Sequence, residues 1–267
     1  MKYIRHINLL AITSWVVVAF LLLPLIAIIP MSFSSSSLLR LPPPGYSLRW
    51  YEAYLLDTAW MTATLNSVLV ACATAVLSVI LGTATAYGLS RSEWKGKALL
   101  QALILSPLLI PGIVIAVATY SVFSMLKLNG TFAGLIIGHT IITFPYTVVV
   151  ITAALERFDP RLEQMAVSLG ASPVKAFMWV TLPIIRAGII IASLFAFLHS
   201  FDEVVMATFI AGPETRTLPL RIWDGIRFEL TPIIAAVSSI LILVSCAVIG
   251  ITEVFNHRSR TIVGAKP

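Results

Sequence analysis

The stretch ERFDPRLEQMAVSLGASPVKAFMWVTLP, residues 156–183, separates two long apolar segments of this 267-residue chain. Asp159 followed by Pro160 is typical of a helix start, with the aspartate as N-cap and the proline in the first helical position. Gly170 is placed to end this helix, because glycine adopts the left-handed conformation of a C-terminal turn without strain. Between these signals, apolar residues recur at the i, i+3, i+4 and i+7 spacing of one helix face, at Leu162, Met165, Ala166 and Leu169.

A second helix is predicted after Gly170. Ser172 followed by Pro173 repeats the cap-and-proline signal. The pair Leu182-Pro183 is expected to end this helix and to begin the next apolar segment. Residues 156–183 are therefore predicted to form a helical hairpin whose first helix has an apolar stripe. That stripe needs a partner surface, either the apolar segments of its own chain or another protein.

Six apolar segments make up most of the chain. Hydrophobic residues are 58% of the sequence and charged residues only 11%, with a mean hydropathy of +0.96, which indicates a membrane protein. A bilayer crossing needs about 20 apolar residues, and segments of this composition satisfy their backbone groups in lipid only as helices. We therefore predict a single all-α membrane domain over residues 1–267 with six transmembrane helices. The predicted spans are residues 9–31, 64–90, 99–125, 132–155, 184–211 and 233–255.

The basic residues predict the orientation of these spans. Lysine and arginine are concentrated near both ends of the chain, at residues 91–97 and in residues 156–186. By the positive-inside rule these parts are cytoplasmic, which places both termini and the hairpin inside. The net charge of +6 then reflects orientation and calls for no nucleic acid partner. The first segment is preceded by Lys2 and Arg5 but offers no small-residue cleavage site, so we interpret it as a retained span.

Two of the predicted spans contain residues that are unusual in a transmembrane helix. Pro107 and the pair Pro111-Gly112 remove two backbone donors from the third span. Such a break is tolerated only beside protein or a cavity, so the segment is either an ordinary kink or part of a pathway.

The fifth span carries the second unusual group, in the sequence HSFDEVV. Asp202 and Glu203 follow His199 at the i+3 and i+4 spacings of one helix side. A carboxylate near the centre of a bilayer costs about 3 kcal/mol, so these side chains should face the bundle interior or a wet cavity. They either hold an interhelical hydrogen bond or a helix break, or attract a cationic substrate on its path.

Enzymatic and metal chemistry have no support in the sequence. The pair Gly96-Lys97 is followed by Ala98, and Arg91 stands where the first glycine of a phosphate-binding loop belongs. The histidines are dispersed, and neither Cys72 nor Cys246 lies near one at ligand spacing. No catalytic residue, metal site or cofactor is expected in this chain. A secondary transporter is also disfavoured, because neither an inverted repeat nor intramembrane ion ligands are evident.

The hairpin resembles the signature loop of ABC importer permeases, in which an acidic residue, a glycine and a Leu-Pro pair keep a fixed spacing. Gln164 and Met165 depart from the usual Glu-Ala-Ala at its second and third positions. The residues implied to couple this chain to an ATPase are Glu163, Ala166, Leu169, Gly170, Ala171, Leu182 and Pro183. By this resemblance the first helix of the hairpin would sit in the cleft of the ATPase.

Other stretches are similar to the spermidine/putrescine branch of these permeases. They are SLRWY (47–51), IPGIV (110–114), SFDEVV (200–205), AGPETRTLPLRIWDGIR (211–227) and TPIIAAVS (231–238). The resemblance implies a multi-pass protein of the type I importer fold in a bacterial inner membrane. Its implied partners are a second permease subunit, two copies of a cytoplasmic ATPase that binds ATP and Mg, and a periplasmic solute-binding protein.

Polyamines are the implied substrates, with His199, Asp202 and Glu203 as candidate pathway residues. The alternative is the same machinery importing another small solute, such as an amino-acid-like compound, an aminophosphonate or ferric ion. The charged run at residues 212–232 is either a solvated surface helix or a contact for the binding protein.

Overall fold

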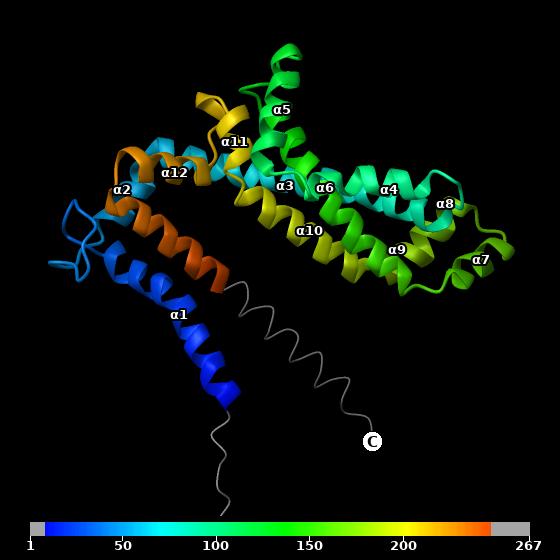
Figure 1. Ribbon diagram of the computed structural model, residues 1–267, viewed down its shortest axis with the longest axis horizontal. Coiled ribbons are helices and arrows are strands. Elements are labelled where there is room, and N and C mark those ends of the chain that lie inside the picture. The colour runs from blue at the N-terminus through cyan, green and yellow to red at the C-terminus, as the bar shows by residue number, and fades with distance from the viewer. Residues whose placement is uncertain (1–8, 247–267) are drawn as a thin grey trace, which may run out of the picture. The chain divides into compact units, whose positions relative to one another are not determined.

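The computed structural model describes residues 9–246, and these form helices joined by loops, with one isolated β-bridge between Ser34 and Tyr46 (Figure 1). The α-helices are α1 (Leu9–Ser32), α2 (Arg49–Leu56), α3 (Thr58–Arg91), α4 (Lys97–Leu105), α5 (Gly112–Met125), α6 (Phe132–Glu156), α7 (Pro160–Ser168), α8 (Pro173–Ala176), α9 (Leu182–Ile184), α10 (Arg186–Phe201), α11 (Val205–Ile210), α12 (Leu218–Phe228) and the helix Pro232–Cys246. The all-α prediction is therefore confirmed for the described residues.

Contacts within the chain divide it into two compact units. Among the described residues, one unit comprises residues 9–61 with 224–246, and the other comprises residues 62–223. In the first unit, the loop after α1 is fixed by polar contacts: Ser32 Oγ lies 2.6 Å from Tyr51 Oη, and Trp50 Nε1 donates to Ser36 O at 3.2 Å. The second unit contains both predicted functional regions.

Within residues 9–246, three helices are long and apolar enough to cross a membrane, and up to five spans result if each of two bent helix pairs counts as one. The three are Ala11–Ser32, Thr58–Arg91 and Phe132–Glu156, which correspond to the predicted first, second and fourth spans. The predicted sixth span is described only as the helix Pro232–Cys246, and residues 247–255 lie outside the described residues. The number of six spans and the cytoplasmic termini stay predictions.

The predicted third span is not one continuous helix. Lys97–Leu108 and Gly112–Met125 meet at 101°. The bend falls where Pro107 and Pro111 lack the backbone N–H that a continuous helix needs. The prolines that the sequence analysis noted therefore produce a complete break rather than a kink.

The predicted fifth span, residues 184–211, also needs correction. Pro173–Ile184 and Arg186–Phe201 meet at 75°, so the helix runs through Leu182-Pro183 and bends after them. A π-helical turn at Phe177–Thr181 precedes the proline and lets Leu182 N bond Phe177 O. At the other end, α10 stops at Phe201 and α11 begins at Val205. Glu203, the residue before the N-cap Val204, accepts the first-turn N–H of Met206 at 2.9 Å through Oε1 and so supports the start of the new helix.

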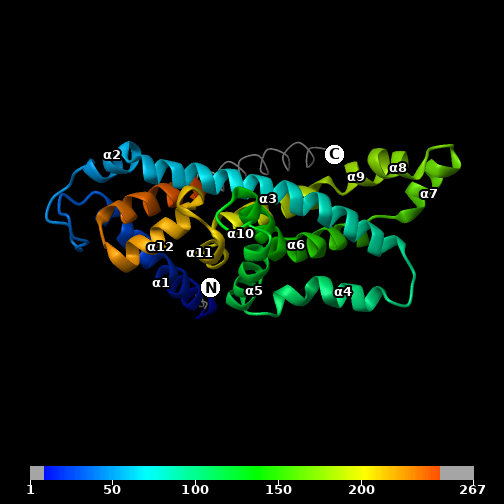
Figure 2. The same ribbon diagram turned by 90° about the horizontal axis from the view of Figure 1, so that it is seen from above.

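The core of the second unit lies around α6, which runs beside α3 and α10 (Figure 2). Small and hydroxyl side chains let these helices approach closely: a Cβ on Gly82 would collide with Thr147, and one on Gly188 would collide with Ala154. Ser78 Oγ lies 2.6 Å from Thr143 Oγ1 between α3 and α6. Close packing of this kind is the usual substitute for the hydrophobic effect between helices in lipid.

Candidate functional site

The hairpin of residues 156–183 forms by the local signals that its sequence carries. Asp159 Oδ1 accepts the N–H of Arg161 at 2.9 Å, so the predicted N-cap of α7 is confirmed. Gly170 has φ of +96°, and the N–H of Ala171 returns to Ala166 O at 3.1 Å to close the helix. Ser172 Oγ accepts the N–H of Lys175 at 3.4 Å and caps α8. The first helix, the glycine turn and the start of the second helix lie where the sequence predicts them, whereas the second helix continues through Leu182-Pro183 instead of ending there.

The apolar stripe of α7 faces away from the described part of its own chain. Leu162 is 39% exposed, Met165 56% and Leu169 90%. Residues 11–246, whose exposure the structure describes, therefore do not bury this stripe, although an apolar stripe normally marks the buried side of a helix. The stripe is left available to another protein.

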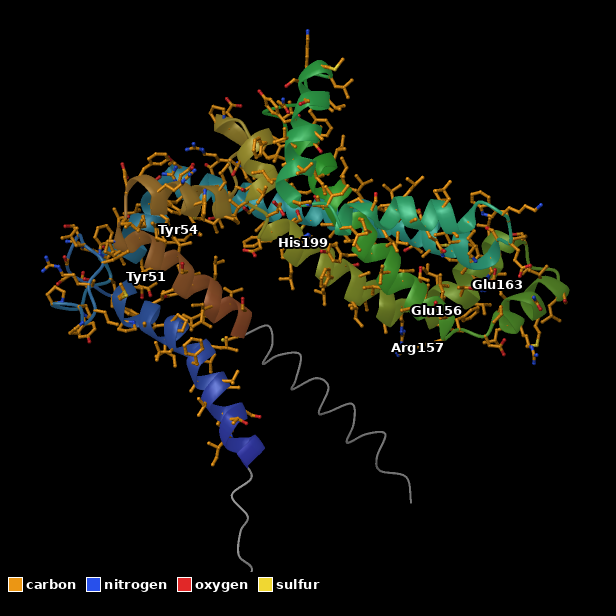
Figure 3. All side chains as sticks on the ribbon, in the orientation of Figure 1. Tyr51, Tyr54, Glu156, Arg157, Glu163 and His199 are labelled. Carbon is orange, nitrogen blue, oxygen red and sulfur yellow. The ribbon has the colours of Figure 1, made fainter. Side chains whose placement is uncertain are left out.

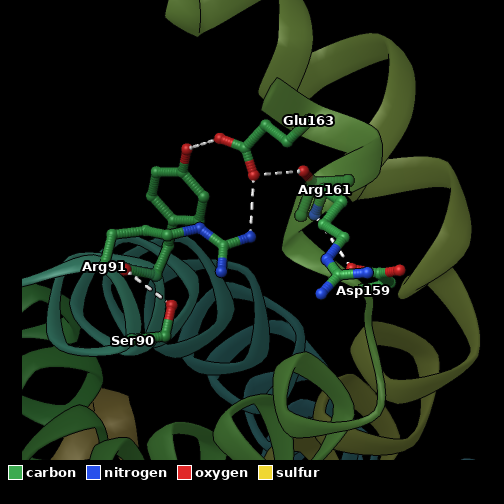
Figure 4. Close-up of polar contacts among 7 residues, drawn as sticks. Ser90, Arg91, Asp159, Arg161 and Glu163 are labelled. Atoms are coloured by element: carbon green, nitrogen blue, oxygen red, sulfur yellow. Dashed lines mark hydrogen bonds and ion pairs between the residues drawn. The ribbon is translucent and has the colours of Figure 1, made fainter. Parts of the chain in front are cut away.

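The opposite orientation is taken by the one acidic residue of α7. Glu163 is only 9% exposed and points toward the C-terminal end of α3 (Figure 4). The hydroxyl of Tyr87 donates to Glu163 Oε1. Arg91 Nη2 donates to Oε2 at 2.8 Å, and Thr181 Oγ1 donates to the same oxygen at 2.9 Å. Both carboxylate oxygens are thus bonded within the chain.

The electrostatics of this cluster favour the ionised carboxylate. Burial raises the pKa of Glu163, but the hydrogen bonds from Tyr87, Arg91 and Thr181, with the charge of Arg91, together lower it below its usual value. Arg91 is itself held between two rings, with its guanidinium carbon 5.5 Å from the ring centroids of both Tyr87 and Phe158. The cluster is a paired, hydrogen-bonded charge rather than an isolated buried acid.

The remaining signature residues have different surroundings. Leu182 lines an apolar cavity of about 600 Å³ together with Tyr87 and Phe177, whereas Pro183 is exposed. Gly170 has open space where a Cβ would point, so its role in the turn is conformational and not steric. Ala166 and Ala171 are partly buried. The coupling role of all these residues stays a prediction.

A second site lies at the break between α10 and α11, apart from the hairpin (Figure 3). His199 and Glu203 line one cavity of about 170 Å³. Tyr146 of α6 stands edge-on to the His199 ring, with ring centroids 5.1 Å apart. The other walls come from α11, from α6 and from the broken third span, at Pro107, Leu108, Ile110, Gly112, Ile115, Ile142 and Met206.

The structure separates the three candidate pathway residues. His199 and Glu203 are brought together, but Asp202 is exposed and does not line this cavity. The i+3 relation that the sequence suggested for Asp202 therefore does not place its side chain in the cavity with His199. The buried His139 Nδ1 lies 2.8 Å from Ser200 Oγ and ties α10 to α6 next to this cavity.

Several site residues were missed by the sequence reasoning. Arg91 served only to predict the orientation of the spans, and neither Tyr87 nor Thr181 was predicted as a site residue. The spacing of Tyr87 and Arg91, one helical turn apart, was an available signal for a shared face. Tyr146, directly after the helix-internal Pro145, is a second missed residue.

The segment after α11 is fastened to the N-terminal half of α3. Asn66 Nδ2 donates to the carbonyl oxygens of Glu214 at 2.9 Å and Arg216 at 3.0 Å. The N–H of Leu218 donates to Ser67 Oγ at 2.7 Å and begins α12. The contact of residues 212–232 with a binding protein stays a prediction.

Residues 78–261 match the protein family described as binding-protein-dependent transport system inner membrane component. The chain is 30% identical to the spermidine/putrescine transport system permease protein PotC of Haemophilus influenzae, over 92% of this chain and 95% of that protein. It is 32% identical to the putrescine transport system permease protein PotI of Escherichia coli, over 86% of this chain and 84% of that protein.

A solved structure of a bacterial ABC transporter that imports the acidic polysaccharide alginate has the same fold. The TM-score is 0.74 at 18% sequence identity, over 96% of this chain and 99% of that chain.

Proposed function

The chain belongs to the family of inner membrane components of binding-protein-dependent transport systems, and from this premise we propose that it forms one half of a membrane path for polyamines. The observation that carries the substrate class is the near full-length similarity to permeases named for spermidine and putrescine. The chain is a transport subunit of an ABC importer. In this proposal it has six spans and cytoplasmic termini in a bacterial inner membrane.

The partners in this proposal follow from what the chain has and lacks. No phosphate-binding loop occurs in the sequence, and the family resemblance implies that two copies of a cytoplasmic ATPase supply the ATP and Mg chemistry. The exposed stripe of Leu162, Met165 and Leu169 is the surface that we assign to that ATPase. A second permease completes the path, and a periplasmic binding protein delivers the substrate.

The proposed contact with the substrate is the cavity at the α10–α11 break. Glu203 supplies a carboxylate and Tyr146 an aromatic ring, which are the two groups that attract ammonium ions most effectively. His199 lines the same cavity, with its ring centroid 5.1 Å from that of Tyr146. The 16 residues of α10 span about 24 Å from the end of the hairpin to this break. The helices α8, α9 and α10 thus follow one another in the chain from the proposed ATPase contact to the cavity.

Reconstitution in liposomes tests the proposal. The chain, its partner permease and the ATPase are assembled, and ATP hydrolysis is measured with the binding protein loaded with putrescine, spermidine, an amino acid, an aminophosphonate or ferric ion. We expect stimulation and uptake with the polyamines alone. Stimulation by another solute and by neither polyamine would replace the substrate class. Failure of the chain to assemble with any ATPase would overturn the coupling role.

A further inference from the structure

We propose that Glu163 acts as a clasp inside this chain: its carboxylate fastens α7 to the C-terminal end of α3, so that displacement of α7 moves α3 directly. This inference rests on the proposed coupling role of α7. It assigns the acidic signature residue to an intramolecular contact and leaves the apolar stripe for the ATPase. Glu163 is thus a positioning residue, which touches neither nucleotide nor substrate.

The donors to Glu163 come from two separate segments of the chain. Tyr87 and Arg91 lie one turn apart on α3 and reach different oxygens of Glu163. Thr181, in the π-helical turn before α9, donates a third bond at 2.9 Å. Three donors from two segments meet on one carboxylate, and charge-assisted bonds of this kind are about twice as strong as neutral ones. The geometry fixes α7 against both segments at once.

The side chains of the donors Tyr87 and Arg91 are themselves held in place by aromatic rings. The Arg91 side chain lies over the rings of Tyr87 and Phe158, and Phe158 is only 5% exposed in the core next to α6. The ring of Tyr87 also contacts that of Phe177, with centroids 4.6 Å apart. Because these rings restrict Tyr87 and Arg91 before any bond to Glu163 forms, little conformational entropy is lost in forming the clasp.

The π-helical turn lies directly beside this cluster. Phe177–Thr181 carries an extra residue in its turn, and π-turns of this kind are frequent at functional sites. Here the turn supplies both the Phe177 ring and the Thr181 hydroxyl to the cluster. Thr181 is fully buried, so its hydroxyl needs the partner that Glu163 provides.

The helix α3 is longer than a bilayer core is thick. Its 34 residues span about 50 Å, whereas a bilayer core is about 30 Å thick. One helix therefore reaches from within the membrane to the hairpin outside it. With α7 clasped to its end, α3 offers a second rigid route for movement, beside the route through α8, α9 and α10.

The division of α7 into two faces supports this assignment. Glu163 is buried against its own chain, while the stripe residues Leu162, Met165 and Leu169 are exposed on the other side. A partner that covers the stripe therefore leaves the clasp closed. The contacts for the partner and for α3 do not compete for the same side chain.

The test compares Glu163→Gln with wild type and with Glu156→Gln, the same substitution at the exposed glutamate that ends α6 and begins the hairpin segment. Hydrogen exchange of residues 160–169 is measured first in the full chain alone. We expect Glu163→Gln to accelerate exchange about tenfold and Glu156→Gln to leave it unchanged, because only Glu163 ties α7 to α3. Unchanged exchange in Glu163→Gln would overturn the clasp.

The second measurement is the amount of substrate imported per ATP hydrolysed by the assembled transporter. Glu163→Gln should keep the ATPase bound but lower this ratio several-fold, since α7 would move without α3. The double variant Glu163→Gln with Arg91→Gln should be no worse than either single variant, because both remove the same link. Additive losses, or loss of ATPase binding in Glu163→Gln, would instead make Glu163 an ATPase contact.

The two proposals fail in distinguishable ways. If the wild-type assembly shows no substrate-stimulated hydrolysis, the proposed function is wrong, and the exchange measurement on the chain alone still decides whether the clasp exists. If the assembly works and the exchange of α7 is the same with and without the Glu163 carboxylate, only the clasp is wrong.

Discussion

The hairpin and the α10–α11 break each contain a glutamate, and the two carboxylates are used in opposite ways. Glu163 is buried, and both of its oxygens are bonded by side chains of its own chain. Glu203 is half-buried, accepts one backbone N–H and lines a cavity. A fully bonded carboxylate holds structure, whereas one beside a cavity can exchange its neighbours for a passing cation.

The apolar residues near the two glutamates differ in the same sense. Beside Glu163, the stripe of α7 is exposed although it is apolar, which is the property of a surface that awaits a partner. Beside Glu203, Met206 is buried and packs into the core of the second unit. The hairpin thus presents an apolar surface to a partner protein, whereas the α10–α11 break lines a cavity inside the second unit.

Leu169→Asp gives the largest expected effect, because it places a charge in the apolar stripe that we assign to the ATPase. Leu169 is 90% exposed, so the fold should tolerate the change. Covering this position by the ATPase would desolvate a charge, and we expect association to weaken about a hundredfold. The measurement is the amount of ATPase that co-purifies with the chain.

Gln164→Glu is the matched control for Leu169→Asp, since it adds the same charge at an exposed position of α7 outside the stripe. Equal loss of ATPase in both variants would show that net charge, and not the stripe, governs association.

Gly170→Val should have the next largest effect. The position has φ of +96°, which a β-branched residue adopts only with strain of about 1–2 kcal/mol, although no atom blocks the side chain. We expect roughly tenfold less uptake with normal membrane insertion, measured by radiolabelled substrate and by membrane fractionation. Gly88→Ala, at an equally open glycine in the ordinary helical conformation of α3, should retain uptake.

Glu203→Gln and Asp202→Asn test which of the two neighbouring carboxylates meets the substrate. The glutamine keeps an oxygen for the N–H of Met206, so the contact at the start of α11 survives while the charge is lost. We expect polyamine uptake to fall about fivefold to tenfold in Glu203→Gln and by less than about twofold in Asp202→Asn. The measurement is initial uptake rate at equal amounts of assembled complex. A larger loss in Asp202→Asn would mean that the exposed carboxylate, and not the cavity, meets the substrate.

Acid pH should give the smallest effect, confined to the hairpin. The pKa of Glu163 is lowered in the folded chain, so the carboxylate stabilises α7 at pH above the ordinary glutamate range and loses this contribution as pH falls through the lowered value. Hydrogen exchange of residues 160–169, corrected for intrinsic rates, should stay constant from pH 7 to about pH 4 and accelerate below it. Glu163→Gln should show no such step.

The sequence determined the features that depend on neighbouring residues. Asp159-Pro160, Gly170 and Ser172-Pro173 fix the starts and stop of the hairpin helices, because caps and left-handed turns need only local backbone groups. The long apolar runs likewise determined α1, α3 and α6, since lipid leaves a backbone no choice other than helix.

Only the tertiary structure decided which faces meet. Periodicity put Glu163 on α7, but its donors Tyr87 and Arg91 lie more than seventy residues earlier in the chain, and no local rule connects them. The fifth span looked continuous because Asp202 and Glu203 are too few to end an apolar run by composition. Three features form the cavity together: the contact between Glu203 and the N–H of Met206, the break in the third span, and the ring of Tyr146. Such a site exists only once distant helices pack against one another.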